Sequence, residues 1–350
     1  MTTARRALQL LPTCATTGIG SLPHSQGELA LQMALQQDLP YLPQLPGGNP
    51  SELMIAAALD GLPGLRFDDE GVCVVDLEQW QHKRDRYTWE IEEALASGNL
   101  AAFEPSRQAS RSFRPFLFEV EARKLPFAKV QIAGPATVRW VAKTSSGKPA
   151  AEVTELDQQI FRLLLARSVA LARAVRKVNA TPVVFLDEPG LYALERNNVR
   201  HMVVLQELKV LIAAVQREGA LVGLHCCSNT DWASVLDLGL DILSIDARLS
   251  LDAGLEESDA WVRFVTSGAT LSLGIVPTDL ASSYRLPELC DSVEASLRAT
   301  TPKGATFEAL LARMLLTPAC GLGLRSVIDA ERIFGEVREA QRRFRALVSA

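Results

Sequence analysis

The sequence predicts an α/β protein, namely a single (β/α)8 (TIM) barrel over residues 1–350, with a β-hairpin and helical insertion after the second strand. Two observations lead to this fold. Short apolar runs alternate with longer segments of helical periodicity, a pattern typical of parallel α/β sheets. The apolar runs number eight, which is the number of strands that closes a barrel.

The expected strands each end in small, polar, glycine or proline residues. In chain order they are Thr16–Gly20, Tyr41–Leu45, Lys129–Ala133, Pro182–Leu186, Leu221–His225, Asp241–Ile245, Thr270–Val276 and Met314–Thr317. Between them, Val153–Asn179 and Val203–Gly219 carry apolar residues at helical spacing. The amphipathic segment Arg325–Ala350 is expected to be the last helix of the outer ring.

Residues 60–120 interrupt this alternation. Leu65–Trp80 has a polar turn between two alternating runs, which predicts a β-hairpin. The residues that follow are polar and favour helix. No Ser/Gly-rich linker separates them from the rest, so we expect one domain with an insertion at about 60–120.

Composition excludes several classes of function. The net charge is −5 with both signs interspersed, which argues against a nucleic-acid partner or a membrane surface. The apolar run near the N-terminus is broken early by Pro12, so no signal peptide is expected and the predicted location is the cytoplasm. Six cysteines lack the regular spacing of a secreted disulfide framework, which favours reduced thiols or metal ligands.

A histidine beside two cysteines ends the fifth expected strand. Side chains alternate between the faces of a strand, so His225 and Cys227 share one face and Cys226 takes the other. Active sites of α/β barrels lie at the C-terminal ends of the strands. The pair His225 and Cys227 is therefore expected at the barrel mouth, although adjacent cysteines at a strand end are also common as small buried apolar residues.

Two further strand ends offer matching ligand types. Asp246 ends the sixth strand and Cys320 follows the eighth. One imidazole, two thiolates and one carboxylate make a four-coordinate set, in which sulfur ligands favour zinc over magnesium or calcium. The sequence therefore predicts a Zn²⁺ site of His225, Cys227, Asp246 and Cys320.

The fourth strand ends in two adjacent acids, Asp187 and Glu188. One should face the mouth and could receive a substrate ammonium or guanidinium group, while the other pairs with a neighbouring element. An ion pair that ties the barrel rim is the alternative. At the end of the first strand, Thr16–Ser25 contains two glycines that allow close backbone approach to a ligand or simply form a tight turn.

Six motifs, taken together, resemble the catalytic barrel of cobalamin-independent methionine synthase. In chain order they read TGIGSLP, QIAGPATV, FLDEPGL, HCCSNTDW, SIDA and TPACGL. The resemblance covers nearly the whole chain. The wider superfamily includes uroporphyrinogen decarboxylase and corrinoid-linked thiol methyltransferases.

The resemblance implies roles for particular residues. The family's zinc ligands match His225, Cys227, Asp246 and Cys320. The family carboxylate is typically glutamate, so Asp246 departs from the pattern. The homocysteine-binding positions of the family match the backbone turn at Ile19 and Ser21, the acid Asp187, and a glutamate for which Glu52 is the match in this chain.

The expected activity is a zinc-dependent transfer of a methyl group to a small thiol, with homocysteine the first candidate. The family has a second barrel that helps hold folate, for which 350 residues leave no room, and a histidine after the seventh strand. Here that region reads LGIVPTDLASS, with Thr278 and Asp279 but no histidine. Methyl-folate needs protonation to react, so these departures favour a methyl-corrinoid donor, free or on a partner protein.

The sequence is also compatible with two other functions. A lyase like uroporphyrinogen decarboxylase would share the barrel, but it needs no metal and uses an arginine cluster that the first-strand end lacks. A non-catalytic barrel that binds zinc or thiols is the second. Structural zinc sites are usually local in sequence, whereas this set is spread over three strands.

Overall fold

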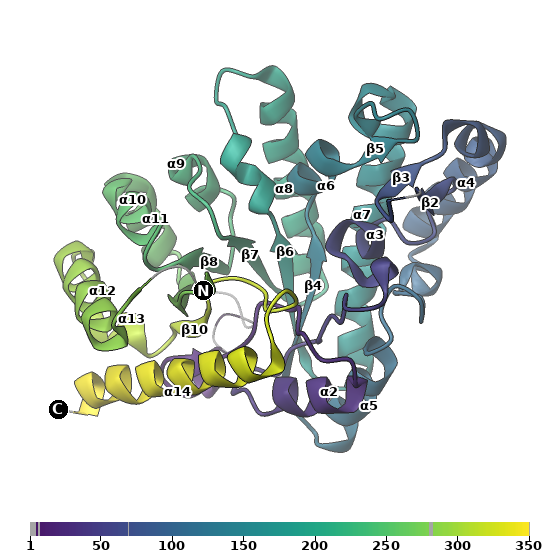
Figure 1. Ribbon diagram of the computed structural model, residues 1–350. Coiled ribbons are helices and arrows are strands. Elements are labelled where there is room, and N and C mark those ends of the chain that lie inside the picture. The colour runs from purple at the N-terminus through teal and green to yellow at the C-terminus, as the bar shows by residue number, and fades with distance from the viewer. Residues whose placement is uncertain (1–4, 6–7, 69, 280–282, 350) are drawn as a thin grey trace.

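A computed structural model describes residues 5, 8–68, 70–279 and 283–349. Seven parallel strands form one curled sheet in the order β1-β10-β9-β8-β7-β6-β4. Their bounds are β1 Ala15–Thr16, β4 Phe127–Ala133, β6 Thr181–Asp187, β7 Leu221–Cys226, β8 Ile242–Asp246, β9 Thr270–Val276 and β10 Leu315–Pro318. Figure 1 shows helices packed around the outside of these strands, which confirms the predicted α/β barrel.

The second expected strand, Tyr41–Leu45, makes isolated bridges instead of a regular ladder. Tyr41 pairs with Lys129 of β4, and Gln44 pairs with Ser21 beyond β1. Pro40, Pro43 and Pro46 interrupt the segment, and proline has no N–H to donate to a ladder. The segment nevertheless contacts both edges of the sheet and so completes the ring.

The outer helices agree with the sequence pattern. The three helices expected from periodicity are α7, α8 and α14. The α-helices are α2 Gly27–Leu35, α3 Met54–Ala58, α4 Leu77–Ser97, α5 Phe113–Ala122, α6 Pro135–Val141, α7 Thr154–Lys177, α8 Val199–Arg217, α9 Trp232–Leu236, α10 Leu251–Glu256, α11 Ser258–Thr266, α12 Leu286–Thr300, α13 Phe307–Leu311 and α14 Val327–Ser349. Short 3-10 turns are η1 Leu8–Leu10, η2 Pro50–Glu52, η3 Ala101–Phe103, η4 Ala150–Glu152 and η5 Pro189–Ala193. No helix in the described part of the chain is both long and apolar enough to cross a membrane.

The predicted hairpin is present. Strands β2 (Leu65–Phe67) and β3 (Cys73–Val75) pair antiparallel, and β5 (Lys143–Thr144) adds to β3 in parallel. This small sheet lies beside α4, away from the central strands (Figure 1).

The barrel interior is apolar at the N-terminal ends of the strands and polar towards the C-terminal ends. Phe127, Phe185, Leu221 and Ile242 belong to the apolar cluster inside the ring. Gly223 makes room for this layer, because a Cβ there would lie 2.5 Å from the Phe185 ring. Further along these strands, alternation brings polar side chains into the interior, and these begin the candidate site.

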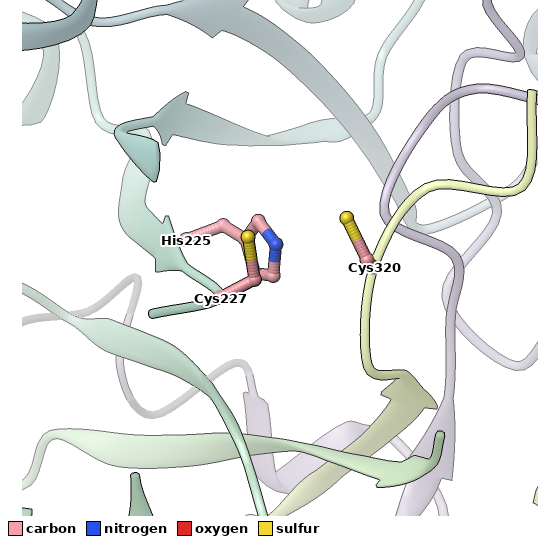
Figure 2. Close-up of side chains that lie close together, drawn as sticks. All are labelled: His225, Cys227 and Cys320. Carbon is pink, nitrogen blue, oxygen red and sulfur yellow. The ribbon is translucent and has the colours of Figure 1, made fainter. Parts of the chain in front are cut away.

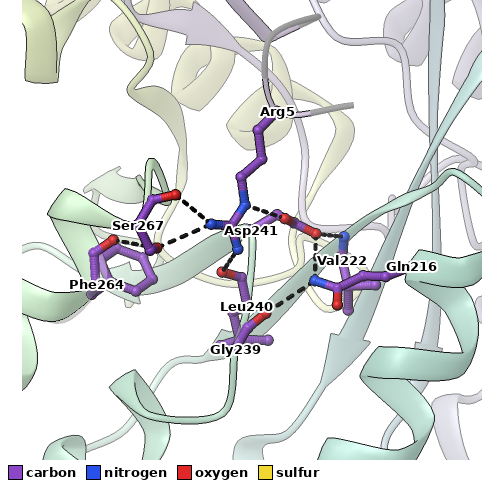
Figure 3. A network of polar contacts seen from close by, with 8 residues as sticks. All are labelled: Arg5, Gln216, Val222, Gly239, Leu240, Asp241, Phe264 and Ser267. Atoms are coloured by element: carbon purple, nitrogen blue, oxygen red, sulfur yellow. Dashed lines mark hydrogen bonds and ion pairs between the residues drawn. The ribbon is translucent and has the colours of Figure 1, made fainter. Parts of the chain in front are cut away.

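Asp241, directly before β8, connects several elements at the N-terminal end of the ring. Its carboxylate accepts hydrogen bonds from Val222 N and Gln216 Nε2, and it pairs with Arg5 (Figure 3). The Arg5 guanidinium also donates to the carbonyl oxygens of Leu240 and Ser267. These bonds hold the starts of β7 and β8 in place and lie at the opposite end of the strands from the candidate site.

Candidate metal centre

Three potential metal ligands meet at the C-terminal ends of β7 and β10. His225 is in β7, Cys227 follows that strand, and Cys320 follows β10. Their ligand atoms, one ring nitrogen and two sulfurs, all lie within 4.8 Å of one another. Figure 2 shows the His225 and Cys227 side chains on one wall of the site and Cys320 reaching towards them from the other. The barrel thus brings together the histidine and both cysteines of the predicted set.

The imidazole of His225 is oriented by a neighbouring strand. It is 3% exposed, and its Nδ1 lies 3.0 Å from the Oγ of Ser244 in β8. Nε2 has no hydrogen-bond partner in the described part of the chain. With Nδ1–H donating to Ser244, Nε2 carries a free lone pair, which is the arrangement found in metal-bound histidines.

The thiols of Cys227 and Cys320 influence each other's ionisation. The neighbouring Cys227 thiol and His225 ring lower the pKa of Cys320 well below the usual thiol value. The proximity of Cys320, together with burial, raises the pKa of Cys227. One thiolate is therefore favoured in the metal-free site, and a bound cation would favour two, since metal ligation requires the deprotonated sulfur.

Cys226 lies outside this cluster, as strand alternation predicted. Its side chain is fully buried in the main hydrophobic core, on the other face of β7. Its Sγ donates to the Ser228 carbonyl oxygen at 3.2 Å. Cys226 is a packing residue behind the site.

Asp246 ends β8 as expected, but its carboxylate is not part of the three-residue cluster. Its Oδ1 accepts hydrogen bonds from the backbone N–H groups of Arg248 at 2.8 Å and Leu249 at 3.1 Å. Asp246 would have to move to reach a metal held by the other three. Its role as a fourth ligand stays a prediction.

The two acids that end β6 have separate surroundings. Asp187 faces the barrel interior, where burial raises its pKa against the opposing effects of Lys129 and His225. Its Oδ1 has no hydrogen-bond partner in the described part of the chain. Glu188 faces outwards and accepts hydrogen bonds from Ala136 N, Thr137 N and Thr137 Oγ1 at the start of α6. Asp187 is thus free to bind a ligand, whereas Glu188 caps a helix.

The turn after β1 reaches the loop that carries Cys320. The Oγ of Ser21 accepts a hydrogen bond from Gly323 N, and its carbonyl oxygen accepts one from Leu322 N. The Ile19 carbonyl oxygen points the other way and accepts from Lys129. The predicted substrate-binding turn therefore lies next to the thiol cluster.

Glu52 has a different environment. It is 2% exposed, and its carboxylate accepts hydrogen bonds from the backbone N–H groups of Leu45 and Arg111 and from Asn49 Nδ2. The Arg111 guanidinium also lies 3.3 Å from it. Substrate binding by Glu52 stays a prediction, and these contacts favour a role in holding the loop after the second barrel segment.

Sequence reasoning did not single out Ser244 or Lys129. Both lie on inward-facing positions of their strands, two residues before Asp246 and Gln131 respectively. The sequence does contain a pattern that could have indicated them. Each is a polar residue within an apolar strand, spaced by two from another polar residue and therefore on the same face of the strand. Lys129 is 1% exposed, and burial lowers the pKa of its ammonium group while Asp187 opposes that shift.

The end of β9 offers no histidine, as the sequence indicated. Thr278 is buried, and Asp279 pairs with Arg248 from the loop after β8 at 3.0 Å. The remainder of LGIVPTDLASS includes residues 280–282, which lie outside the described residues.

Comparisons with known proteins bear on the fold. No family model matches the chain, and no curated protein sequence matches it. A solved methyltransferase from Methanosarcina mazei is similar over 95% of this chain and 96% of its own, with a TM-score of 0.54 and 17% identity. A B12-independent methionine synthase from Shewanella sp. W3-18-1, in complex with selenomethionine, covers 67% of this chain and 68% of its own at a TM-score of 0.47 and 11% identity.

The likeness to the Methanosarcina mazei protein shows a shared fold along nearly the whole chain. At 17% identity it says nothing by itself about substrate or metal. Function has to follow from the side chains at the barrel mouth.

Proposed function

We propose that the protein is a zinc-dependent S-methyltransferase that methylates a small thiol, with homocysteine as the first candidate. The observation that carries this proposal is the meeting of His225, Cys227 and Cys320 at the C-terminal ends of the strands. A free Nε2 and two thiols form a soft donor set that suits zinc. The methyltransferase of similar fold from Methanosarcina mazei supports the choice of reaction class.

Zinc bound by these three residues would lower the pKa of a substrate thiol, so that the thiol ionises at neutral pH. The chain's own residues then act mainly by position. Cys227 and Cys320 supply two negative charges beside the substrate sulfur, which keep it electron-rich. Ser244 holds the His225 ring in the orientation that exposes Nε2.

The substrate's amino acid moiety is assigned to the two polar features beside the cluster. Asp187, whose Oδ1 is unpaired, would receive the ammonium group. The backbone of the Ile19–Ser21 turn would receive the carboxylate. The substrate thiolate attacks the methyl carbon, forming the S–C bond as the bond from that carbon to the donor breaks with its electron pair.

The donor we propose is a methyl-corrinoid rather than methyl-folate. Cobalt leaves with the electron pair and needs no proton, whereas the folate nitrogen must be protonated. The related family has a histidine after the seventh strand. Here the described residues after β9 that could donate this proton are Thr278 and Asp279, and Asp279 is already paired with Arg248.

The test is loss of methylcobalamin absorbance with homocysteine present, using zinc-loaded protein and a metal-free sample as the control. We expect methylation of homocysteine from methylcobalamin to be faster than from methyl-folate. Equal rates from both donors would contradict the choice of donor. Zinc-loaded protein that methylates homocysteine from neither donor would favour a non-catalytic zinc- or thiol-binding barrel.

A further inference from the structure

Lys129 is a buried cation inside the barrel, below the metal cluster. It is 1% exposed, and its Nζ lies 4.5 Å from the centre of the Phe185 ring and 5.9 Å from that of Tyr41. A buried ammonium group is costly unless hydrogen bonds and a counter-charge compensate it. The partners of Lys129 therefore show which parts of the site this buried charge can hold in place.

The hydrogen bonds of Lys129 go to the turn after β1. Nζ donates to the Ile19 carbonyl oxygen at 2.6 Å and lies 3.4 Å from Gln131 Oε1. Gln131 in turn donates to the Leu42 carbonyl oxygen at 2.7 Å. The turn rests directly on this pair, because a Cβ at Gly20 would lie 2.7 Å from Gln131 Nε2. Lys129 thus fixes the backbone proposed to bind the substrate carboxylate.

The counter-charge is Asp187. Asp187 lies two residues beyond Phe185 on the same face of β6, next to the ring that Lys129 Nζ approaches to 4.5 Å, and both charged groups are buried. It is also the acid that raises the pKa of Lys129 against the effect of burial. Asp187 Oδ1 has no hydrogen-bond partner in the described part of the chain. The carboxylate is therefore balanced in charge by Lys129 and still open to a ligand.

We propose that Lys129 is a positioning residue that sets both halves of the amino-acid-binding site from below, without touching the substrate. One buried charge holds the Ile19–Ser21 turn through Ile19 and balances Asp187. This inference rests on the proposed function. It implies that recognition of an amino-acid thiol depends on Lys129, whereas binding of a thiol without amino and carboxylate groups does not.

The experiment measures zinc content and thiol binding by calorimetry on the zinc-loaded full chain. The probes are homocysteine and propanethiol, which shares the thiol but lacks both charged groups. The variants are Lys129→Met, which keeps the length of the side chain, and Lys129→Gln, which covers the case that the first does not fold. Lys129→Arg is the matched control that keeps the charge.

We expect Lys129→Met and Lys129→Gln to keep zinc and propanethiol binding, and to weaken homocysteine binding by about tenfold or more. Lys129→Arg should recover most of that loss. An unchanged ratio of homocysteine to propanethiol affinity in the neutral variants would overturn the proposal, even if their melting temperatures fall. Wild-type protein that binds no zinc or neither thiol would instead overturn the proposed function, so the two failures are distinguishable.

Discussion

Ser244 Oγ lies 3.0 Å from His225 Nδ1, across the β7–β8 ladder in which these two residues are register partners. Both side chains are buried, so the bond does not compete with bulk water. It fixes the ring orientation and leaves Nε2 for a ligand. Buried polar atoms in a protein core normally have hydrogen-bond partners. The buried Nε2, which has none in the described part of the chain, therefore distinguishes His225 from an ordinary core histidine.

We predict that Ser244→Ala weakens zinc binding by roughly 10–100-fold, because outer partners of metal-bound histidines have effects of that size. The measurement is competition for zinc with a chelator of known affinity. Ser272→Ala is the matched control, since Ser272 is a buried serine on the adjacent strand with no hydrogen-bond partner for its Oγ. Equal affinities for the two variants would show that the Ser244 bond has no effect on the metal.

Cys226 and Cys320 should respond differently to the same substitution. Cys226→Ala removes a core sulfur and is expected to cost about 1 kcal/mol of unfolding free energy with full zinc content retained. Cys320→Ala removes a ligand and should abolish zinc binding. Thermal melts and metal analysis of both proteins check this. Zinc loss in Cys226→Ala would mean that the assignment of the two faces of β7 is wrong.

Asp246→Asn is expected to retain zinc. The asparagine Oδ1 can still accept from the N–H groups of Arg248 and Leu249, and the carboxylate is outside the ligand cluster. Metal analysis after dialysis against a weak chelator is the measurement, with Cys227→Ser as the reference for a lost ligand. If Asp246→Asn loses zinc as Cys227→Ser does, Asp246 is a fourth ligand that moves on metal binding.

Glu188 should make stability depend on pH. Burial raises its pKa from 4.5 to about 7, with its hydrogen bonds from Thr137 and Ala136 opposing the shift. The folded state then binds the proton of Glu188 more tightly than the unfolded state does. The resulting contribution to the free energy of unfolding is therefore fully present below pH 4.5 and is lost as the pH rises to about 7. The loss amounts to about 3 kcal/mol at most.

Glu188→Gln cannot ionise and should lack this contribution to the pH dependence. The measurement is the unfolding free energy of wild type and variant between pH 4.5 and about 7. Burial also raises the pKa of Asp187, but this residue is present in both proteins, so its effect cancels in the difference between them. Parallel curves for the two proteins would refute the assignment to Glu188.

The sequence could predict what depends on periodicity and strand order. Alternation along β7 separates Cys226 from His225 and Cys227, and the closure of the barrel brings Cys320 to them. Both features follow from the backbone pattern, which hydrophobic residues determine. The proline-broken segment at Tyr41–Leu45 departs from a regular strand, although its place in the ring is as expected.

The carboxylates were harder to predict, because their partners depend on local backbone geometry. Asp246 and Glu52 both accept hydrogen bonds from nearby N–H groups, which no spacing in the sequence reveals. Strand alternation predicts that Asp187 and Glu188 face opposite ways. It does not say which of them faces inwards, because that depends on where β6 ends. The hydrogen bond from Lys129 to the Ile19 carbonyl oxygen joins residues far apart in the sequence, so it can be recognised only in the folded structure.

The most direct test of the account is zinc stoichiometry combined with X-ray absorption at the zinc edge. Wild type is expected to bind one zinc ion per chain, with sulfur ligands at about 2.3 Å and imidazole nitrogen at about 2.0 Å. Cys227→Ser and Cys320→Ser, folded as judged by circular dichroism, should each lose the metal. Wild-type protein without zinc, or full zinc retention in both variants, would contradict the central claim.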